Sequence, residues 1–256
     1  MFKRCQHLLI GAALALGMSV AHAEKVTIAA AADLKYAMAD VAQAFEKTHP
    51  DDKLDIVYGS SGKALTQIQQ GAPYDLYFSA DIDYPRELEK AGLVVGKITP
   101  YAFGRIVLWS TTLDASKMTL QSLASPDIKH IAIANPKHAP YGMRAVEAIK
   151  AAGVWDKVEP KLVYAETVPH AAQLVESGNA QVAVLSLSLV LNPQIASKGK
   201  YWLIPDRLHQ PLEQAYAITK HGEHNAAAKA FAQYMAQPEA RAIMQRYGFV
   251  LPGELK

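Results

Sequence analysis

The sequence contains a single cysteine in 256 residues. This residue, Cys5, lies before the apolar run of residues 8–20, and no thiol follows it. Everything after residue 5 therefore lacks disulfide bonds, thiolate metal sites and cysteine nucleophiles. Cys5 also precedes the apolar run, so it is not the lipidated cysteine that follows a lipoprotein signal.

Long apolar runs are scarce as well. The run at residues 8–20 is too short for a membrane-spanning helix, and no later segment offers about 18 uninterrupted apolar residues. Lys3 and Arg4 precede the run, and Ala21-His22-Ala23 follows it. This pattern is typical of a secretory signal peptide over residues 1–23 with cleavage after Ala23. We therefore expect an exported protein that is not embedded in a membrane.

The chain has no excess of one charge. It contains 26 basic and 24 acidic residues, and loss of Lys3 and Arg4 with the signal peptide leaves 24 of each. A nearly neutral protein argues against nucleic acid or an anionic membrane as a partner.

Strand and helix patterns alternate along most of the chain. Short apolar runs at 26–30, 54–58 and 74–79 are each followed by a helical pattern, and the order resumes after residue 105 with runs at 106–110, 130–134, 161–165 and 181–185. This alternation predicts the α/β class with mostly parallel sheets flanked by helices. Residues 225–247 are expected to be helical, with a break at Pro238.

The preferred arrangement has two lobes with the ligand in the cleft between them. Lobe 1 is expected to be discontinuous, from residues 24–104 and 212–256, and lobe 2 to span 105–211. The crossings near Phe103–Ile106 and Leu212–Ala215 are expected to act as hinges.

Ligands of open α/β sheets bind beyond the carboxyl ends of strands, so the strand-to-helix turns are the candidate sites. The turn Gly59-Ser60-Ser61-Gly62-Lys63 offers hydroxyl and N–H donors for an anion, although N-capping explains a serine there equally well. The other three turns carry Asp33, Tyr141 and Thr167-Val168-Pro169. Taken alone, Asp33 is expected to be an N-cap, Tyr141 a packing residue and Pro169 a helix-initiating residue.

Enzyme signatures are missing from the sequence. It has no GxSxG, HExxH or glycine-rich dinucleotide motif. The histidines of the expected mature chain are dispersed, apart from the pair His221 and His224, so a zinc site is not expected. Donors without a nucleophile and base favour binding over catalysis.

Five segments carry a resemblance to a known family: "VTIAAAADLKYAM", "YGSSGKALTQIQQGAPYDLYFSAD", "ANPKHAPYGMRAVEAI", "LVYAETVPHAAQLVESGNAQVAVLSLS" and "RYGFVLP". Together they resemble the periplasmic molybdate-binding proteins of molybdate ABC transporters, over essentially the whole mature chain. The resemblance implies a type II periplasmic-binding-protein fold. It also implies a monomer in the periplasm that needs no cofactor and delivers molybdate or tungstate to an inner-membrane permease and its ATPase.

In this family, hydroxyl and main-chain N–H groups hold the anion, without a metal cation site. Carried over by motif, the oxyanion-binding positions are Asp33, Ser60, Ser61, Tyr141, Val168 and Ser186. The chain departs from the common pattern at Asp33, Tyr141 and Ser186. A coupled exchange would let Tyr141 donate its phenol to the anion where another tyrosine is replaced by Ser186.

Asp33 is the harder departure, because a carboxylate repels a dianion. Either its side chain caps the first helix, or the ligand is a protonated oxyanion such as phosphate. Sulfate is a further alternative ligand.

Lys63 and Arg144 are expected to be solvated and to steer anions, and Asp75 and Asp81 to be structural acceptors. Other classes also remain open: a secreted serine hydrolase using Ser61 or Ser186, and a signalling receptor.

Overall fold

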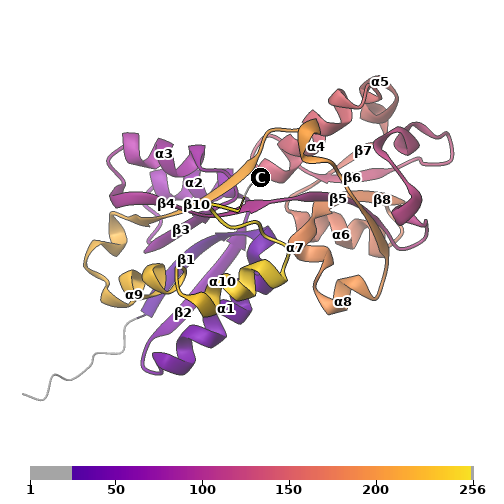
Figure 1. Cartoon of the computed structure of the whole chain (residues 1–256). Helices are drawn as coiled ribbons and strands as arrows, with labels where there is room; N and C mark the ends of the chain where they lie inside the picture. Colours follow the sequence, from indigo (N-terminus) through magenta and orange to yellow (C-terminus); the bar gives the residue numbers. More distant parts are fainter. Residues whose placement is uncertain (1–24, 255–256) are drawn as a thin grey trace, which may run out of the picture.

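The computed structural model describes residues 25–254. The expected signal peptide, its cleavage site and Cys5 lie outside the described residues. Figure 1 shows two lobes side by side, each built on its own sheet. Within residues 25–254, no helix is both long and apolar enough to cross a membrane.

The first sheet has the strand order β2-β1-β3-β10-β4. Its strands are β1 (Lys25–Ala31), β2 (Lys53–Gly59), β3 (Leu76–Ser79), β4 (Val94–Gly104) and β10 (Leu212–Thr219). Strand β1 pairs in parallel with both β2 and β3, whereas β10 pairs antiparallel with β3 and β4. The first lobe therefore combines N-terminal and C-terminal segments.

The second sheet repeats this plan with the order β7-β6-β8-β5-β9. Its strands are β5 (Ile106–Ser110), β6 (Ile131–Ala134), β7 (Leu162–Ala165), β8 (Val182–Ser186) and β9 (Lys200–Leu203). Strand β6 is parallel to β7 and β8, and β5 is antiparallel to β8 and β9. The expected two-lobed α/β fold is confirmed, and each sheet is mixed because two antiparallel strands complete its parallel part.

Helices cover the sheets of both lobes (Figure 1). The first lobe carries α1 (Lys35–Thr48), α2 (Ser61–Gln69), α3 (Asp83–Lys90), α9 (Ala226–Tyr234) and α10 (Pro238–Arg246). The second carries α4 (Pro140–Ala151), α5 (Trp155–Val158), α6 (Val168–Glu176), α7 (Leu187–Val190) and α8 (Pro193–Ala196). Short 3-10 helices are η1 (Ala32–Leu34), η2 (Ala115–Lys117), η3 (Leu120–Ala124), η4 (Glu159–Lys161), η5 (Asp206–Leu208) and η6 (His221–His224). The break at Pro238 is confirmed, because α10 begins there.

The cores follow the alternation of side chains along the strands. In β1, Val26, Ile28 and Ala30 face one apolar cluster, whereas Ala29 faces the other. The second lobe has one large cluster, in which Trp109 of β5 is fully buried. Each sheet is therefore packed on both faces, and its strand ends hold fixed positions.

The chain crosses between the lobes twice. Strand β4 ends at Gly104 and β5 begins at Ile106, so Arg105 forms the first crossing. Residues 204–211 form the second, between β9 and β10. The second crossing was expected near Leu212–Ala215, and it ends directly before Leu212, which begins β10 and pairs with Gly104.

Candidate functional site

A small cavity lies where the strand ends of the two lobes meet. Including its opening to solvent, the space between atoms there is about 240 Å³. The first lobe lines it with the segments that follow β1, β2 and β3, and the second with the starts of α4 and α6. The lining residues are Ala31, Ala32, Asp33, Gly59, Ser60, Ser61, Ala80, Ala139, Pro140, Tyr141, Thr167 and Val168. The four candidate turns therefore converge on one site.

Helix starts surround this cavity. The helices η1, α2, α4 and α6 all begin among its lining residues. Neither α2 nor α4 has a side-chain hydrogen bond at its N-cap. The first N–H groups of a helix have no partner within the helix, and they lie at the positive end of its dipole. The surroundings of the cavity are thus suited to an anion.

Ser61 is held firmly at the start of α2. Its Oγ accepts a hydrogen bond from the Ala80 N–H at 3.0 Å, and its carbonyl oxygen accepts one from the Tyr77 hydroxyl at 2.7 Å. The hydroxyl hydrogen of Ser61 is donated to no acceptor among the described residues. It is therefore available to a ligand in the cavity.

Ser60 joins the two lobes instead. Its Oγ lies 2.9 Å from Nδ1 of His138, in the segment before α4. The neighbouring Gly62 N–H donates to the carbonyl oxygen of the same histidine at 2.9 Å. Lys63 Nζ lies 2.6 Å from Glu166 Oε1, across the cleft. Lys63 is thus half exposed but paired, and it forms part of an interlobe contact.

Asp33 does not cap a helix, contrary to expectation. Its side chain makes no capping hydrogen bond. Instead, its Oδ2 accepts from the Tyr141 hydroxyl at 3.0 Å and from Gln214 Nε2 at 2.8 Å. The residue is buried, and this burial raises the pKa of Asp33 to about 6, against the lowering effects of the hydrogen bonds with Gln214 and Tyr141 and of the residue's own backbone N–H. Its other oxygen, Oδ1, is buried without a hydrogen-bond partner among the described residues.

Tyr141 lines the cavity, but its hydroxyl hydrogen is directed to Asp33. The same oxygen accepts from Gln214 Nε2 at 3.0 Å. The orientation of the Gln214 amide is set by the Tyr101 hydroxyl, which donates to Gln214 Oε1 at 2.6 Å. The predicted phenolic donation from Tyr141 to an anion therefore differs from the observed geometry, in which Tyr141 positions Asp33.

Val168 and Ser186 have different locations. Val168 lines the cavity as the first residue of α6, whose N-cap Thr167 accepts from the His170 N–H at 3.4 Å. Ser186 is not among the lining residues, and its Oγ caps α7 by accepting from the Leu189 N–H at 3.3 Å. The structure therefore brings together every predicted site residue except Ser186.

Three residues of this region were not predicted. Ser188 donates from Oγ to the Asp33 carbonyl oxygen at 2.8 Å, so it links α7 to the first lobe. Gln214 and Tyr101 complete the network around Asp33, from β10 and β4. No local sequence pattern marks them, because their partners lie far away in the chain.

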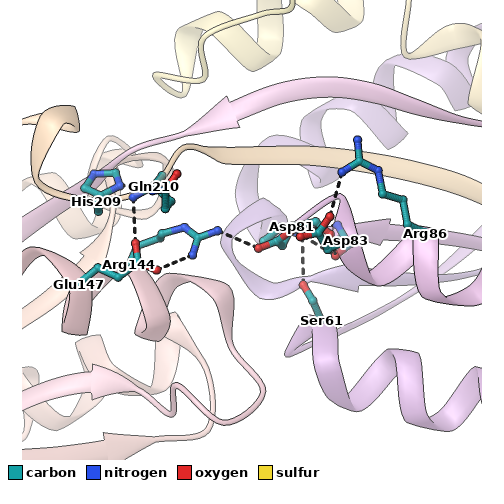
Figure 2. Close-up of polar contacts among 10 residues, drawn as sticks. Ser61, Asp81, Asp83, Arg86, Arg144, Glu147, His209 and Gln210 are labelled. Carbon is teal, nitrogen blue, oxygen red and sulfur yellow. Dashed lines mark hydrogen bonds and ion pairs between the residues drawn. The ribbon is translucent and has the colours of Figure 1, made fainter.

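Arg144 is not a solvated steering residue (Figure 2). Its side chain is only 12% exposed, and Nη2 lies 2.9 Å from Asp81 Oδ2 in the first lobe. Nη1 lies 2.8 Å from Glu147 Oε1, and Glu147 Oε2 accepts from the Gln210 N–H at 2.9 Å. Arg144 therefore links the first lobe to the second chain crossing through two carboxylates. Burial, the largest effect, raises the pKa of Asp81, although Arg144 opposes this shift.

Asp75 and Asp81 both accept structural hydrogen bonds, as expected. Asp75 Oδ2 accepts from the Thr27 N–H at 2.7 Å, and Asp81 Oδ1 accepts from the Asp83 N–H at 3.0 Å. Over residues 25–254, no group of three or more His, Cys, Asp or Glu side chains is placed to hold a metal ion.

Comparisons with known proteins agree with this architecture. Residues 26–250 match the family model described as bacterial extracellular solute-binding protein. The molybdate-binding protein ModA of Rhodobacter capsulatus is 35% identical over 242 residues, covering 93% of each chain. ModA of Escherichia coli is 34% identical, covering 98% of this chain and 100% of the relative.

A solved structure shows the same similarity in three dimensions. The periplasmic molybdate-binding protein of Azotobacter vinelandii superimposes with a TM-score of 0.83 at 32% sequence identity, covering 89% of this chain and 99% of that one. Sequence and structure thus agree over nearly the whole of the described region. The chain belongs to the family of bacterial extracellular solute-binding proteins, in the group that includes the molybdate-binding protein ModA.

Proposed function

We propose that the protein captures molybdate in the periplasm and delivers it to an inner-membrane ABC permease with its ATPase. The names of its relatives support molybdate as the ligand. The observation that carries the proposal is the convergence of three helix starts, those of α2, α4 and α6, with the buried hydroxyl of Ser61 on one interlobe cavity. Tungstate has the same shape and charge, and we expect it to bind too.

Neutral donors are proposed to hold the anion. None of the described residues that line the cavity is a lysine or arginine. The nearby cations Lys63 and Arg144 are paired with Glu166 and Asp81. A fixed set of hydroxyl and N–H donors offsets the loss of water around a dianion when each oxygen is satisfied. The proposed donors are the Ser61 hydroxyl and first-turn N–H groups, including that of Val168. The proposal needs no cofactor.

Lobe closure is the proposed mechanism. The lobes are proposed as residues 24–104 with 212–256, and residues 105–211, in a monomer exported by the signal peptide. Interlobe contacts at Ser60, Gly62 and Arg144 support a closed state stabilised around the ligand. The chain crossings at Arg105 and residues 204–211 are the proposed hinges.

Titration of the purified protein with oxyanions tests this proposal. Isothermal calorimetry and intrinsic fluorescence should show tight binding of molybdate and tungstate, and much weaker binding of sulfate and phosphate. Tight phosphate or sulfate binding with no molybdate binding would overturn the assignment.

A serine hydrolase is the second candidate, because Ser60 contacts His138. Its third member would be Glu166, whose Oε2 lies 3.9 Å from His138 Nε2, beyond hydrogen-bond distance. Glu166 is bound to Lys63 instead. Ser61 and Ser186, the serines suggested by sequence, make no hydrogen bond to a histidine among the described residues. Turnover of ester substrates by purified protein, lost in Ser60→Ala, would favour this alternative.

A further inference from the structure

Asp33 is the only acidic residue among the described residues that line the cavity. Its side chain is buried, so water screens its charge poorly. An ionised Asp33 would therefore repel the dianion of the proposed function. The contacts of its two carboxylate oxygens show how the site avoids this repulsion.

The two oxygens are used unequally. Oδ2 accepts from both Tyr141 and Gln214, at 3.0 and 2.8 Å. Oδ1 is buried and has no partner among the described residues. If the carboxyl group holds a proton, it is therefore on Oδ1, because two donors already point at Oδ2.

Resting on the proposed function, we propose that Asp33 binds the anion as a neutral carboxylic acid that donates its Oδ1 proton to an anion oxygen. Capture of a dianion then takes up one proton from solvent as the lobes close. The carboxyl group thereby changes from a repulsive charge into a hydrogen-bond donor.

The surroundings of Asp33 favour the neutral form. Burial raises its pKa to about 6, and a dianion alongside would raise it further. The titratable groups that contact it directly or through Gln214 are two phenols, those of Tyr141 and Tyr101. Four elements pack on η1: α1 carries Lys35, Tyr36, Asp40, Glu46 and Lys47, β2 carries Lys53, Asp55 and Tyr58, α6 carries His170 and Glu176, and α7 carries no charge. The carboxylate of Asp33 also contacts α4, which carries Arg144, Glu147 and Lys150, and β10, which carries Glu213 and Tyr216. The raised pKa arises from burial, which the hydrogen bonds oppose, and none of these charges is among its causes.

The proposal fixes the sign of the pH dependence. Binding raises the pKa of Asp33, so the acid form is favoured in the complex. Molybdate affinity should be greatest below the pKa of the free protein and should fall as pH rises through the pKa of the complex. Between these two values the loss approaches tenfold per pH unit, which is the slope for one proton.

Calorimetry in buffers of different ionisation heat measures the protons taken up per molybdate bound. At neutral pH we expect the wild-type protein to take up close to one proton. Asp33→Asn keeps an acceptor for Tyr141 and Gln214 and places an N–H donor at Oδ1, so it imitates the acid. It should bind molybdate with no proton uptake and with an affinity that no longer changes with pH.

His138 provides the necessary control, since it is a titratable group that contacts Ser60 beside the cavity. Proton uptake should persist in His138→Gln. Molybdate binding without proton uptake in the wild type, uptake that survives in Asp33→Asn, or uptake lost in His138→Gln would overturn this inference alone. Absence of molybdate binding by the wild type would overturn the proposed function and this inference together. If Asp33→Asn does not fold, the proton uptake of the wild type and the pH dependence of its molybdate affinity still test the inference.

Discussion

Arg144 of α4 and Asp81 of the turn after β3 form an ion pair between the two lobes, with 2.9 Å separating Nη2 and Oδ2. Both side chains are 12% exposed. Asp81 adjoins Ala80, whose N–H holds Ser61 Oγ in place. The pair therefore joins the two lobes directly beside the proposed anion site, and we expect it to stabilise the proposed closed state.

Replacing Arg144 should weaken ligand capture. In Arg144→Met, Asp81 lacks its interlobe partner in both states. In the closed state it is buried without that cation, whereas an open cleft would expose it to water, so the substitution destabilises the closed state. Loss of one partner from a buried, hydrogen-bonded ion pair costs about 2–5 kcal/mol, so we expect molybdate Kd to rise roughly 30-fold or more. Stopped-flow kinetics should place most of this change in the dissociation rate.

The matched control is Arg246→Met, which removes an exposed ion pair with Asp40 within the first lobe. Such pairs contribute at most about 1 kcal/mol, so affinity should hardly change. Equal effects of the two variants would show that the interlobe pair does not stabilise closure.

Gly62 offers a steric test of closure. A Cβ atom at this position would lie 2.9 Å from the carbonyl oxygen of His138, in the opposite lobe. Gly62→Ala should therefore hinder closure while leaving the fold of each lobe intact. Overpacking costs about 1–3 kcal/mol, which corresponds to a loss of molybdate affinity of roughly five- to 150-fold.

Gln69→Ala, on the exposed face of the same helix, serves as its control. The melting temperature of ligand-free Gly62→Ala should stay close to that of the wild type. A large drop in melting temperature would indicate that the substitution damages the first lobe instead.

Ser61 is expected to contribute more to molybdate affinity than its neighbour Ser60. Ser61→Ala removes a free hydroxyl donor and leaves the Ala80 N–H without its acceptor. A hydrogen bond to a charged group contributes about 1.5–3 kcal/mol, so molybdate affinity should fall roughly tenfold to 150-fold by calorimetry. Ser60→Ala should cost less, because its hydroxyl already contacts His138. The reverse order would assign the ligand hydroxyl to Ser60.

Asp33 should make stability depend on pH. Its pKa is raised from 3.8 to about 6 in the folded protein, so folding favours the protonated form. Its contribution to stability is complete below the unfolded value and is lost as pH rises through about 6. The loss is at most about 3 kcal/mol, from about 1.4 kcal/mol per pH unit.

Urea unfolding of ligand-free Asp33→Asn measures this effect. Relative to the wild type, the variant should gain stability near neutral pH and little in acid. Asp55→Asn, at an exposed carboxylate paired with Lys25, should show no such gain. Parallel curves for wild type and Asp33→Asn would argue against a raised pKa.

Local patterns predicted the repeating part of the fold well. Strand β5 was expected at residues 106–110 and has these bounds, and Pro169, which was expected to initiate a helix, lies in the first turn of α6. The apolar period and the Thr167 cap lie in or directly beside α6, so the local sequence is enough to predict this helix. The edge strands β4 and β9 were not predicted, because neither stands out as a short buried run. Their pairing with β10 and β5 depends on distant partners.

The candidate site likewise contains residues that local patterns could predict and residues whose roles depend on distant partners. Ser60, Ser61 and Val168 follow strands and begin helices, so their convergence could be predicted from the chain alone. The role of Asp33 could not, because Gln214 lies 181 residues away and Tyr141 lies 108 residues away. A single carboxylate at a helix start is most often a cap, and only its tertiary partners show otherwise. Arg144 was misjudged for the same reason, since Asp81 belongs to the other lobe.

The strand orders of the two sheets also bear on the timing of folding. The second sheet uses only strands between Ile106 and Leu203, so it can assemble as soon as that segment is released. The first sheet needs β10 between β3 and β4, and β10 comes more than 100 residues after β4. A chain that emerges N-terminus first therefore completes its second lobe first, while the first sheet stays incomplete until β10 is released.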